Sequence, residues 1–240
     1  MEEIRSLYIK KMLNIKKFIS IICIFLFLPS IQAKKLNETY MRAYFKYLNG
    51  LQEEKNFNYS SAISLYNDAI RIYKKFPEPY YRIGLIYTKK FEYNMAITYF
   101  KIAEKYEKKF KNKTDYINFL VESAKLFYKV NDNENALKFY NKLYKIKITP
   151  EIVFRIGEIY YRKKRFLLAK NYLEKFVKNT KKFDEKLEKA LKILVNINMD
   201  EQNYAQALKY LKLLYKHFPT QEIKKRISIL SNNLRYYDEK

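Results

Sequence analysis

The stretch YYRIGLIYTKKFEYNMAITYF, residues 80–100, places a glycine inside a run whose apolar residues follow helical spacing. Tyr80, Ile83, Gly84 and Tyr87 fall at positions i, i+3, i+4 and i+7, which form one face of a helix. Glycine in a helix interior costs about 1 kcal/mol relative to alanine, and the chain has only three glycines. We therefore expect a second helix to pack so close to Gly84 that no side chain fits between the two.

The same pattern recurs along the chain. Gly50 and Gly84 are 34 residues apart, and so are Ala62 and Ala96. One further copy has Gly157, while two others have Ala124 or Val195 in the glycine position. A fixed period of this length is typical of repeat architectures. The predicted packing positions are Gly50, Gly84, Ala124, Gly157, Ala62, Ala96, Ala136, Ala169 and Ala207.

These residues and spacings resemble the tetratricopeptide repeat family, in its bacterial exported type. The resemblance implies an all-α fold: a right-handed superhelical solenoid of about five antiparallel helix pairs with a C-terminal capping helix. It also implies that small residues let the paired helices approach. The copies are expected near residues 43–76, 77–110, 117–149, 150–183 and 188–219, followed by a cap at 220–237.

The chain departs from the family pattern in two ways. Lys46, Tyr80, Leu120, Val153 and Leu191 replace the usual tryptophan near the start of each copy. The period also stretches to 40 residues between Ala96 and Ala136, and to 38 between Ala169 and Ala207. The resemblance nevertheless covers nearly all of residues 34–240, which we expect to form one continuous array.

The first 33 residues have the layout of a secretory signal peptide. Lys16 and Lys17 precede an apolar run at residues 18–28, and Ala33 offers a small residue for cleavage. The run is short for a membrane span, which needs about 20 residues. We expect a mature chain that begins at Lys34, with an uncleaved inner-membrane anchor as the alternative and Met12 as an alternative start. Either way the protein is expected to be exported, periplasmic or associated with the cell envelope.

Catalytic residues are scarce. The only histidine is His217, and the only cysteine, Cys23, lies in the predicted leader. No phosphate-binding loop, HExxH zinc motif or calcium loop occurs. We expect a non-enzymatic protein with no cofactor, no metal site and no catalytic residues, in which His217 complements the dipole at a helix C-terminus.

The net charge of +24 comes mainly from lysine, which is less suited than arginine to forked phosphate recognition. We interpret this charge as a solvated surface or as an attraction for an anionic partner such as a membrane surface or an acidic protein. An exported chain is not expected to bind nucleic acid.

The first helix of each copy has a second face that points toward the concave side of such an array. A groove there would bind a peptide or helix of another protein, an apolar segment with acidic flanks, with Lys125 and Arg162 along the edge. Packing between repeats is the alternative role for these side chains. Tyr47 and Leu51 replace the Lys and Asn with which some family members hold a C-terminal carboxylate, which argues against that mode. The candidate groove residues are Tyr47, Tyr81, Leu85, Tyr128, Phe154 and Tyr161.

The sequence therefore predicts an exported, non-enzymatic adaptor that binds a partner protein of the envelope. The alternative is a scaffold at the membrane surface, held there by lysine charge or by an uncleaved N-terminal anchor.

Overall fold

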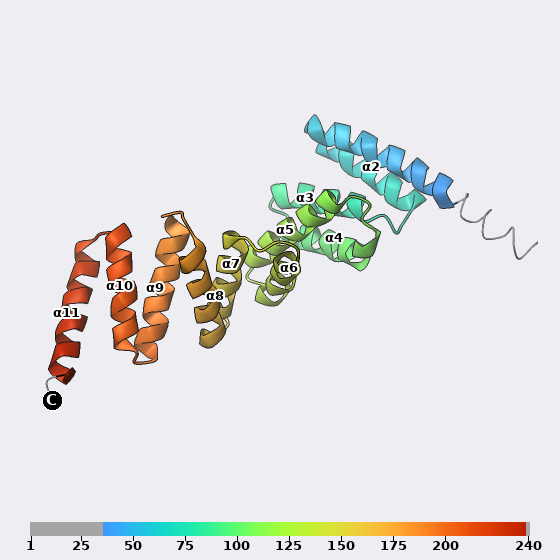
Figure 1. Cartoon of the computed structure of the whole chain (residues 1–240). Coiled ribbons are helices and arrows are strands. Elements are labelled where there is room, and N and C mark those ends of the chain that lie inside the picture. The colour runs from blue at the N-terminus through green and yellow to red at the C-terminus, as the bar shows by residue number, and fades with distance from the viewer. Residues whose placement is uncertain (1–35, 239–240) are drawn as a thin grey trace, which may run out of the picture. The chain divides into compact units, whose positions relative to one another are not determined.

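The protein is all-α in the part that the computed structural model describes, residues 36–238, with side chains through residue 234 (Figure 1). The predicted leader and its cleavage site lie outside the described residues. Within residues 36–238, no helix combines the length and apolarity that a membrane crossing would need. The helices form two compact units, with the boundary between Lys111 and Asn112.

Unit 1 holds two helix pairs and a short 3-10 helix. The first pair packs against the second through α2 and α3. In chain order its elements are the helical segment 36–55, α2 (Tyr59–Ile72), α3 (Pro77–Lys89), α4 (Tyr93–Lys105) and η1 (Glu107–Lys109).

Unit 2 holds three helix pairs and a terminal helix. Each helix packs on the one before it, and α11 covers α10 at the end of the unit. In chain order its elements are α5 (Lys113–Lys129), α6 (Asn133–Ile146), α7 (Pro150–Arg162), α8 (Phe166–Asn179), α9 (Glu185–Asp200), α10 (Tyr204–His217) and α11 (Gln221–Asp238).

The predicted fold class, an all-α array of antiparallel helix pairs closed by a terminal helix, is confirmed. The helices that open the second and fourth copies begin at Pro77 and Pro150, where the sequence places them. The structure differs in dividing one expected array into two units. The boundary falls within the longest spacing between copies, where the extra residues form η1 and let α5 begin at Lys113, before the expected start at residue 117.

The same turn joins the first helix to the second in every copy. Seven residues after each packing position, one residue has a left-handed backbone with φ between 55° and 63°. In the first copy, Asn58 N–H donates to the Glu53 carbonyl at 2.9 Å and Phe57 N–H to the Glu54 carbonyl at 3.0 Å, as in a Schellman motif. The five left-handed residues are Phe57, Phe91, Asn131, Lys164 and Gln202.

This turn establishes the register of the fifth copy, which has no small residue in the glycine position. Gln202 N–H donates to the Met199 carbonyl and Asn203 N–H to the Asn198 carbonyl, with the spacing found in the other four turns. Val195 therefore occupies the same position as Gly84, although its side chain is larger.

Each glycine lies against a large side chain of the second helix in its own copy. A Cβ atom on Gly50 would lie 2.5 Å from Cε1 of Tyr66, and one on Gly84 would overlap the ring of Phe100. Neither glycine has a positive φ, so close packing rather than backbone conformation accounts for their presence. The facing side chains are Tyr66 for Gly50, Phe100 for Gly84 and Leu173 for Gly157.

The small residues of the second helices are equally enclosed. The second helices have fully buried alanines at Ala62, Ala96, Ala136, Ala169 and Ala207. Ala124, in the glycine position of the third copy, is also fully buried.

Gly84→Ala tests the close approach because two effects oppose each other. Helix propensity alone would stabilise the variant by about 1 kcal/mol. Overlap of the new methyl group with Phe100 is expected to outweigh that gain, for a net loss of about 1–3 kcal/mol in the free energy of unfolding. Urea denaturation measures it, with the exposed change Lys101→Gln as the control, which should stay within about 0.5 kcal/mol. A Gly84→Ala variant more stable than the wild type would contradict the packing.

Candidate functional site

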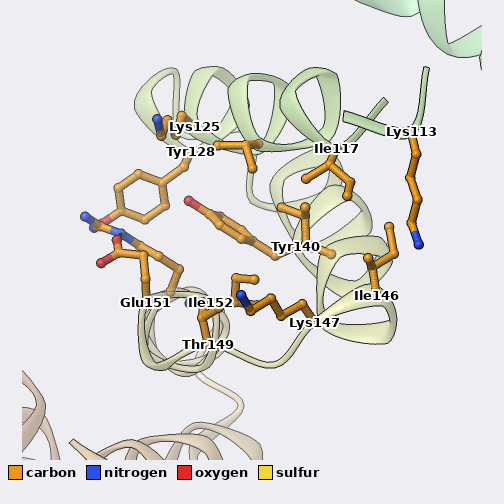
Figure 2. A pocket seen from close by; sticks show the side chains of 13 residues that line it. Lys113, Ile117, Lys125, Tyr128, Tyr140, Ile146, Lys147, Thr149, Glu151 and Ile152 are labelled. Carbon is orange, nitrogen blue, oxygen red and sulfur yellow. Dashed lines mark hydrogen bonds and ion pairs between the residues drawn. The ribbon is translucent and has the colours of Figure 1, made fainter. Parts of the chain in front are cut away.

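A cleft of about 720 Å³ lies between α5, α6 and α7 in unit 2 (Figure 2). Apolar side chains from all three helices form its walls, and basic side chains stand at its rim. Its volume is within the range of about 300–1,000 Å³ that is usual for ligand sites. The lining residues are Lys113, Ile117, Val121, Lys125, Tyr128, Tyr140, Leu143, Ile146, Lys147, Thr149, Glu151, Ile152 and Arg155.

The cleft lies where the third copy lacks an aromatic ring; the fifth copy also lacks one and has Lys192 at the same position. Three residues before the packing position, the first, second and fourth copies have Tyr47, Tyr81 and Phe154, whereas the third copy has Val121. Tyr81 fills its place by packing on Phe100, with ring centroids 6.0 Å apart. The shorter Val121 leaves the corresponding space in unit 2 open, and it lines the cleft.

The structure corrects the predicted groove at three residues. Tyr47, Tyr81 and Phe154 are buried, with at most 6% of each residue exposed, so they cannot line an accessible surface. The reason is geometric: a residue three positions before the glycine shares the glycine's helical face, which is turned toward the second helix. Their role is packing, the alternative that the sequence left open.

The other predicted groove residues are half-buried. Tyr128 lines the cleft, together with the predicted edge residue Lys125. Leu85 lies in unit 1, and the ring of Tyr161 packs on Phe166. Of the six predicted groove residues, the cleft therefore includes only Tyr128.

Sequence reasoning missed most of the walls, including Ile117, Val121, Tyr140 and Ile152. The signal was present in the first four copies, where Val121 is the one residue that is not aromatic at the position three residues before the packing position. That signal becomes readable only once this position is known to face the second helix.

The rim is positively charged. Lys113, Lys125, Lys147 and Arg155 line the cleft beside a single acid, Glu151. Glu151 accepts a hydrogen bond from Arg155 Nε at 2.9 Å, and its other oxygen lies 2.5 Å from Lys186 Nζ. The acid is therefore already paired, and the remaining field at the cleft is basic.

Two arginines of α7 stack on Tyr128. The guanidinium carbons of Arg155 and Arg162 lie 4.8 Å and 4.1 Å from the centroid of the ring, within the range of cation–π attraction. Arg162 also donates to the Tyr128 hydroxyl. This stack joins α5 to α7 at one end of the cleft.

A buried carboxylate holds these arginines in place. Glu158 accepts a hydrogen bond from Arg155 Nη1 at 3.1 Å, and Lys189 Nζ of α9 lies 2.5 Å from its Oε1 atom. Burial alone would raise the pKa of Glu158, but Lys189, Tyr128 and Arg155 outweigh burial and hold the pKa below its ordinary value. Burial likewise opposes the charge of Arg155, yet Glu151 and Glu158 raise the pKa of its guanidinium.

No group of three or more histidine, cysteine, aspartate or glutamate side chains within residues 36–234 could hold a metal ion. His217 ends α10, where its ring stacks on Phe183 with centroids 4.1 Å apart.

Loss of the Glu158 carboxylate should destabilise the chain in a pH-dependent way. Glu158→Gln leaves several partly exposed cations without their partner, so we expect a loss of about 2 kcal/mol at neutral pH, below the roughly 3–5 kcal/mol of fully buried pairs. Because the pKa is lowered in the folded state, the contribution is complete above the ordinary value of 4.5 and disappears as the pH falls below it. Denaturation of both proteins at neutral and acid pH should therefore show a gap that closes in acid.

Glu134→Gln is the matched control, because Glu134 pairs with Lys163 but its side chain is 85% exposed. That change should stay within about 0.5 kcal/mol at either pH. Equal losses for the two variants would mean that Glu158 does not organise the arginines.

Comparison with known proteins supports the repeat assignment. Residues 77–109 and 150–183 match the family model of the tetratricopeptide repeat, one segment in each unit. A TPR repeat-containing protein of Methanocaldococcus jannaschii is 26% identical over 154 residues, or 61% of this chain. The chain spans about a quarter (26%) of that relative's length.

Solved structures share the fold at low identity. The structure of YrrB, described as a TPR protein with an unusual peptide-binding site, has a TM-score of 0.61 and 15% identity, covering 82% of this chain and 96% of that one. A chain of the Naa15/Naa10 complex bound to HypK-THB has a TM-score of 0.60 and 17% identity, covering 87% of this chain and 31% of that one. Residues 77–109 and 150–183 thus match the tetratricopeptide repeat, and the same turn in all five copies shows that the other copies are built on a similar helix pair.

Proposed function

We propose that the chain is a non-enzymatic adaptor whose cleft between α5, α6 and α7 binds an apolar segment of a partner protein with acidic flanks. The observation that carries this proposal is the substitution of Val121 for an aromatic residue. The smaller side chain opens an apolar site. The same position is filled by a buried aromatic ring in the first, second and fourth copies.

The walls favour large apolar side chains. Ile117 and Val121 of α5 face Leu143 of α6 and Ile152 of α7 across the cleft. A partner residue that enters would be surrounded by protein on three sides, which is the setting in which interface residues contribute most binding energy. An apolar anchor therefore fits better than a charged one.

The rim favours acidic flanks. Lys113 and Lys147 are exposed, and Lys125 is engaged only by Glu122 of its own helix. Exposed charges of this kind mainly speed association and select the sign of the partner. A solved structure of similar fold is described as having a peptide-binding site, which supports a peptide as the bound form.

The leader supports an exported adaptor with a partner in the cell envelope. Lysines, an apolar run and a small residue follow one another in residues 1–33 in the order that secretion signals use.

Processing at Ala33 is testable on the native protein. We expect N-terminal sequencing of the protein isolated from its own cells to begin at Lys34. A native protein that retains residues 1–20 would contradict cleavage and favour a membrane anchor.

Binding can be measured with a short fluorescent peptide that has three large apolar residues between acidic ones. Fluorescence anisotropy should show saturable binding that weakens with salt, and a peptide with basic flanks should bind at least tenfold more weakly. Val121→Tyr should fill the cleft as Tyr81 fills its own copy, so the melting temperature holds while peptide binding is lost. Lys125→Glu with Lys147→Glu tests the rim without changing the walls, and should reduce affinity for the acidic peptide.

Ile229→Tyr is the control, since Ile229 is an exposed apolar residue of α11 in the same unit. This variant should bind the peptide as the wild type does. Unchanged binding by both the Val121 variant and the double lysine variant would place the binding site elsewhere.

A further inference from the structure

Unit 1 contains a complete carboxylate site of its own. The buried Glu54 accepts hydrogen bonds from the Tyr66 hydroxyl at 2.9 Å and from Arg82 Nε at 2.9 Å. Lys89 Nζ donates to its other oxygen at 3.2 Å. The carboxylate comes from the first helix of one copy, the tyrosine from the second helix, and the two cations from the next copy.

Unit 2 repeats the donors of this site but not the acid. Tyr140 stands four residues after Ala136, as Tyr66 does after Ala62. Arg155 lies two residues before Gly157, as Arg82 does before Gly84. Arg162 lies five residues after Gly157, as Lys89 does after Gly84. The position of Glu54, four residues after the packing position, is held by Tyr128.

The Tyr140 hydroxyl is consequently left without an acceptor. The residue is only 5% exposed, and its hydroxyl makes no hydrogen bond to any described residue. Figure 2 shows the ring inside the cleft with the hydroxyl turned toward Tyr128. The ring is buried while the hydroxyl lines the open cleft, so the hydroxyl can donate to a bound group there.

Arg155 also retains free donors beside it. Its Nε atom is bound by Glu151 and its Nη1 atom by Glu158, which leaves the Nη2 group without a hydrogen bond among the described residues. The guanidinium is fixed by these two acids and by the Tyr128 ring, so its unused N–H groups are held at the cleft wall.

We propose that a carboxylate of the partner occupies in unit 2 the place that Glu54 occupies in unit 1, accepting hydrogen bonds from Tyr140 and Arg155. The inference rests on the proposed function and specifies it, since it requires an acid next to the apolar anchor inside the cleft. An aspartate or glutamate side chain and a free C-terminal carboxylate share this chemistry.

The chemistry favours a carboxylate over a neutral group. Arg155 and Tyr140 offer donors only, because a tyrosine of raised pKa stays protonated and arginine has no acceptor. A flat acceptor with two oxygens matches such a pair. In unit 1 a tyrosine and an arginine at the same repeat positions hold one carboxylate.

Three fluorescent peptides with one apolar core distinguish the two sources of the acid in binding to the full chain. The first has an aspartate after the core and an amidated C-terminus. The second has asparagine in place of the aspartate, and the third is the asparagine peptide with a free C-terminal carboxylate. If a side chain supplies the acid, the first should bind about tenfold more tightly than the second. If a free C-terminus supplies the carboxylate, the third peptide should bind about tenfold more tightly than the second.

Tyr140→Phe removes only the hydroxyl and should abolish most of that advantage, without lowering the melting temperature. Tyr66→Phe is the matched control, because its hydroxyl serves Glu54 in unit 1. That change should lower the melting temperature and leave peptide binding unaltered. A loss of peptide binding in Tyr66→Phe, with unchanged binding and a lower melting temperature in Tyr140→Phe, would overturn the proposal.

Tyr128→Glu supplies the missing acid within the chain and copies the arrangement around Glu54. It should weaken binding of the acidic peptide more than binding of the asparagine peptide, because its carboxylate competes for the same donors.

Equal affinities of all three peptides for the wild type, with no effect of Tyr140→Phe, would overturn the carboxylate site while leaving the apolar cleft intact. A failure of every peptide to bind would overturn the proposed function itself, and the carboxylate site with it.

Discussion

The packing of each second helix against a position without a large side chain is the constraint on which the rest of the structure depends. Where Gly84 faces Phe100, the two backbones approach so closely that a methyl group would overlap the ring. That approach sets the register of the pair. The place of every other residue in the copy is then fixed by its distance in sequence from this position. The left-handed residue of the turn, for example, always lies seven residues after it.

Because each repeat position has a fixed place in the fold, a single substitution in one copy changes the structure only locally. Valine at the position equivalent to Tyr81 lines a cleft in the third copy, and tyrosine at the position equivalent to Glu54 leaves the Tyr140 hydroxyl without an acceptor. Neither change disturbs the helices, because the packing position itself is preserved as Ala124. The site therefore follows from two differences from the first copy, which has Tyr47 and Glu54 at the positions of Val121 and Tyr128.

The sequence predicts the helices and their pairing because periodicity and small residues report directly on packing. The fourth copy, expected from residue 150, does begin there with α7, where the Thr149 hydroxyl accepts from Ile152 N–H at 3.3 Å. The sequence prediction fails for Tyr47, Tyr81 and Phe154, because an aromatic residue on a helix has the same pattern whether it meets a partner or a neighbouring helix. The division after Lys111 was also not foreseen, since a longer spacing does not reveal whether the contacts continue across it.

A crystal structure of the full chain with the amidated, aspartate-containing apolar peptide tests the central claim most directly. We expect the apolar side chains between α5, α6 and α7, beside Val121. The aspartate carboxylate should lie within hydrogen-bond distance, about 2.7–3.2 Å, of the Tyr140 hydroxyl and of Arg155. A peptide bound outside this cleft, or one whose carboxylate faces solvent while Tyr140 remains without an acceptor, would contradict the account.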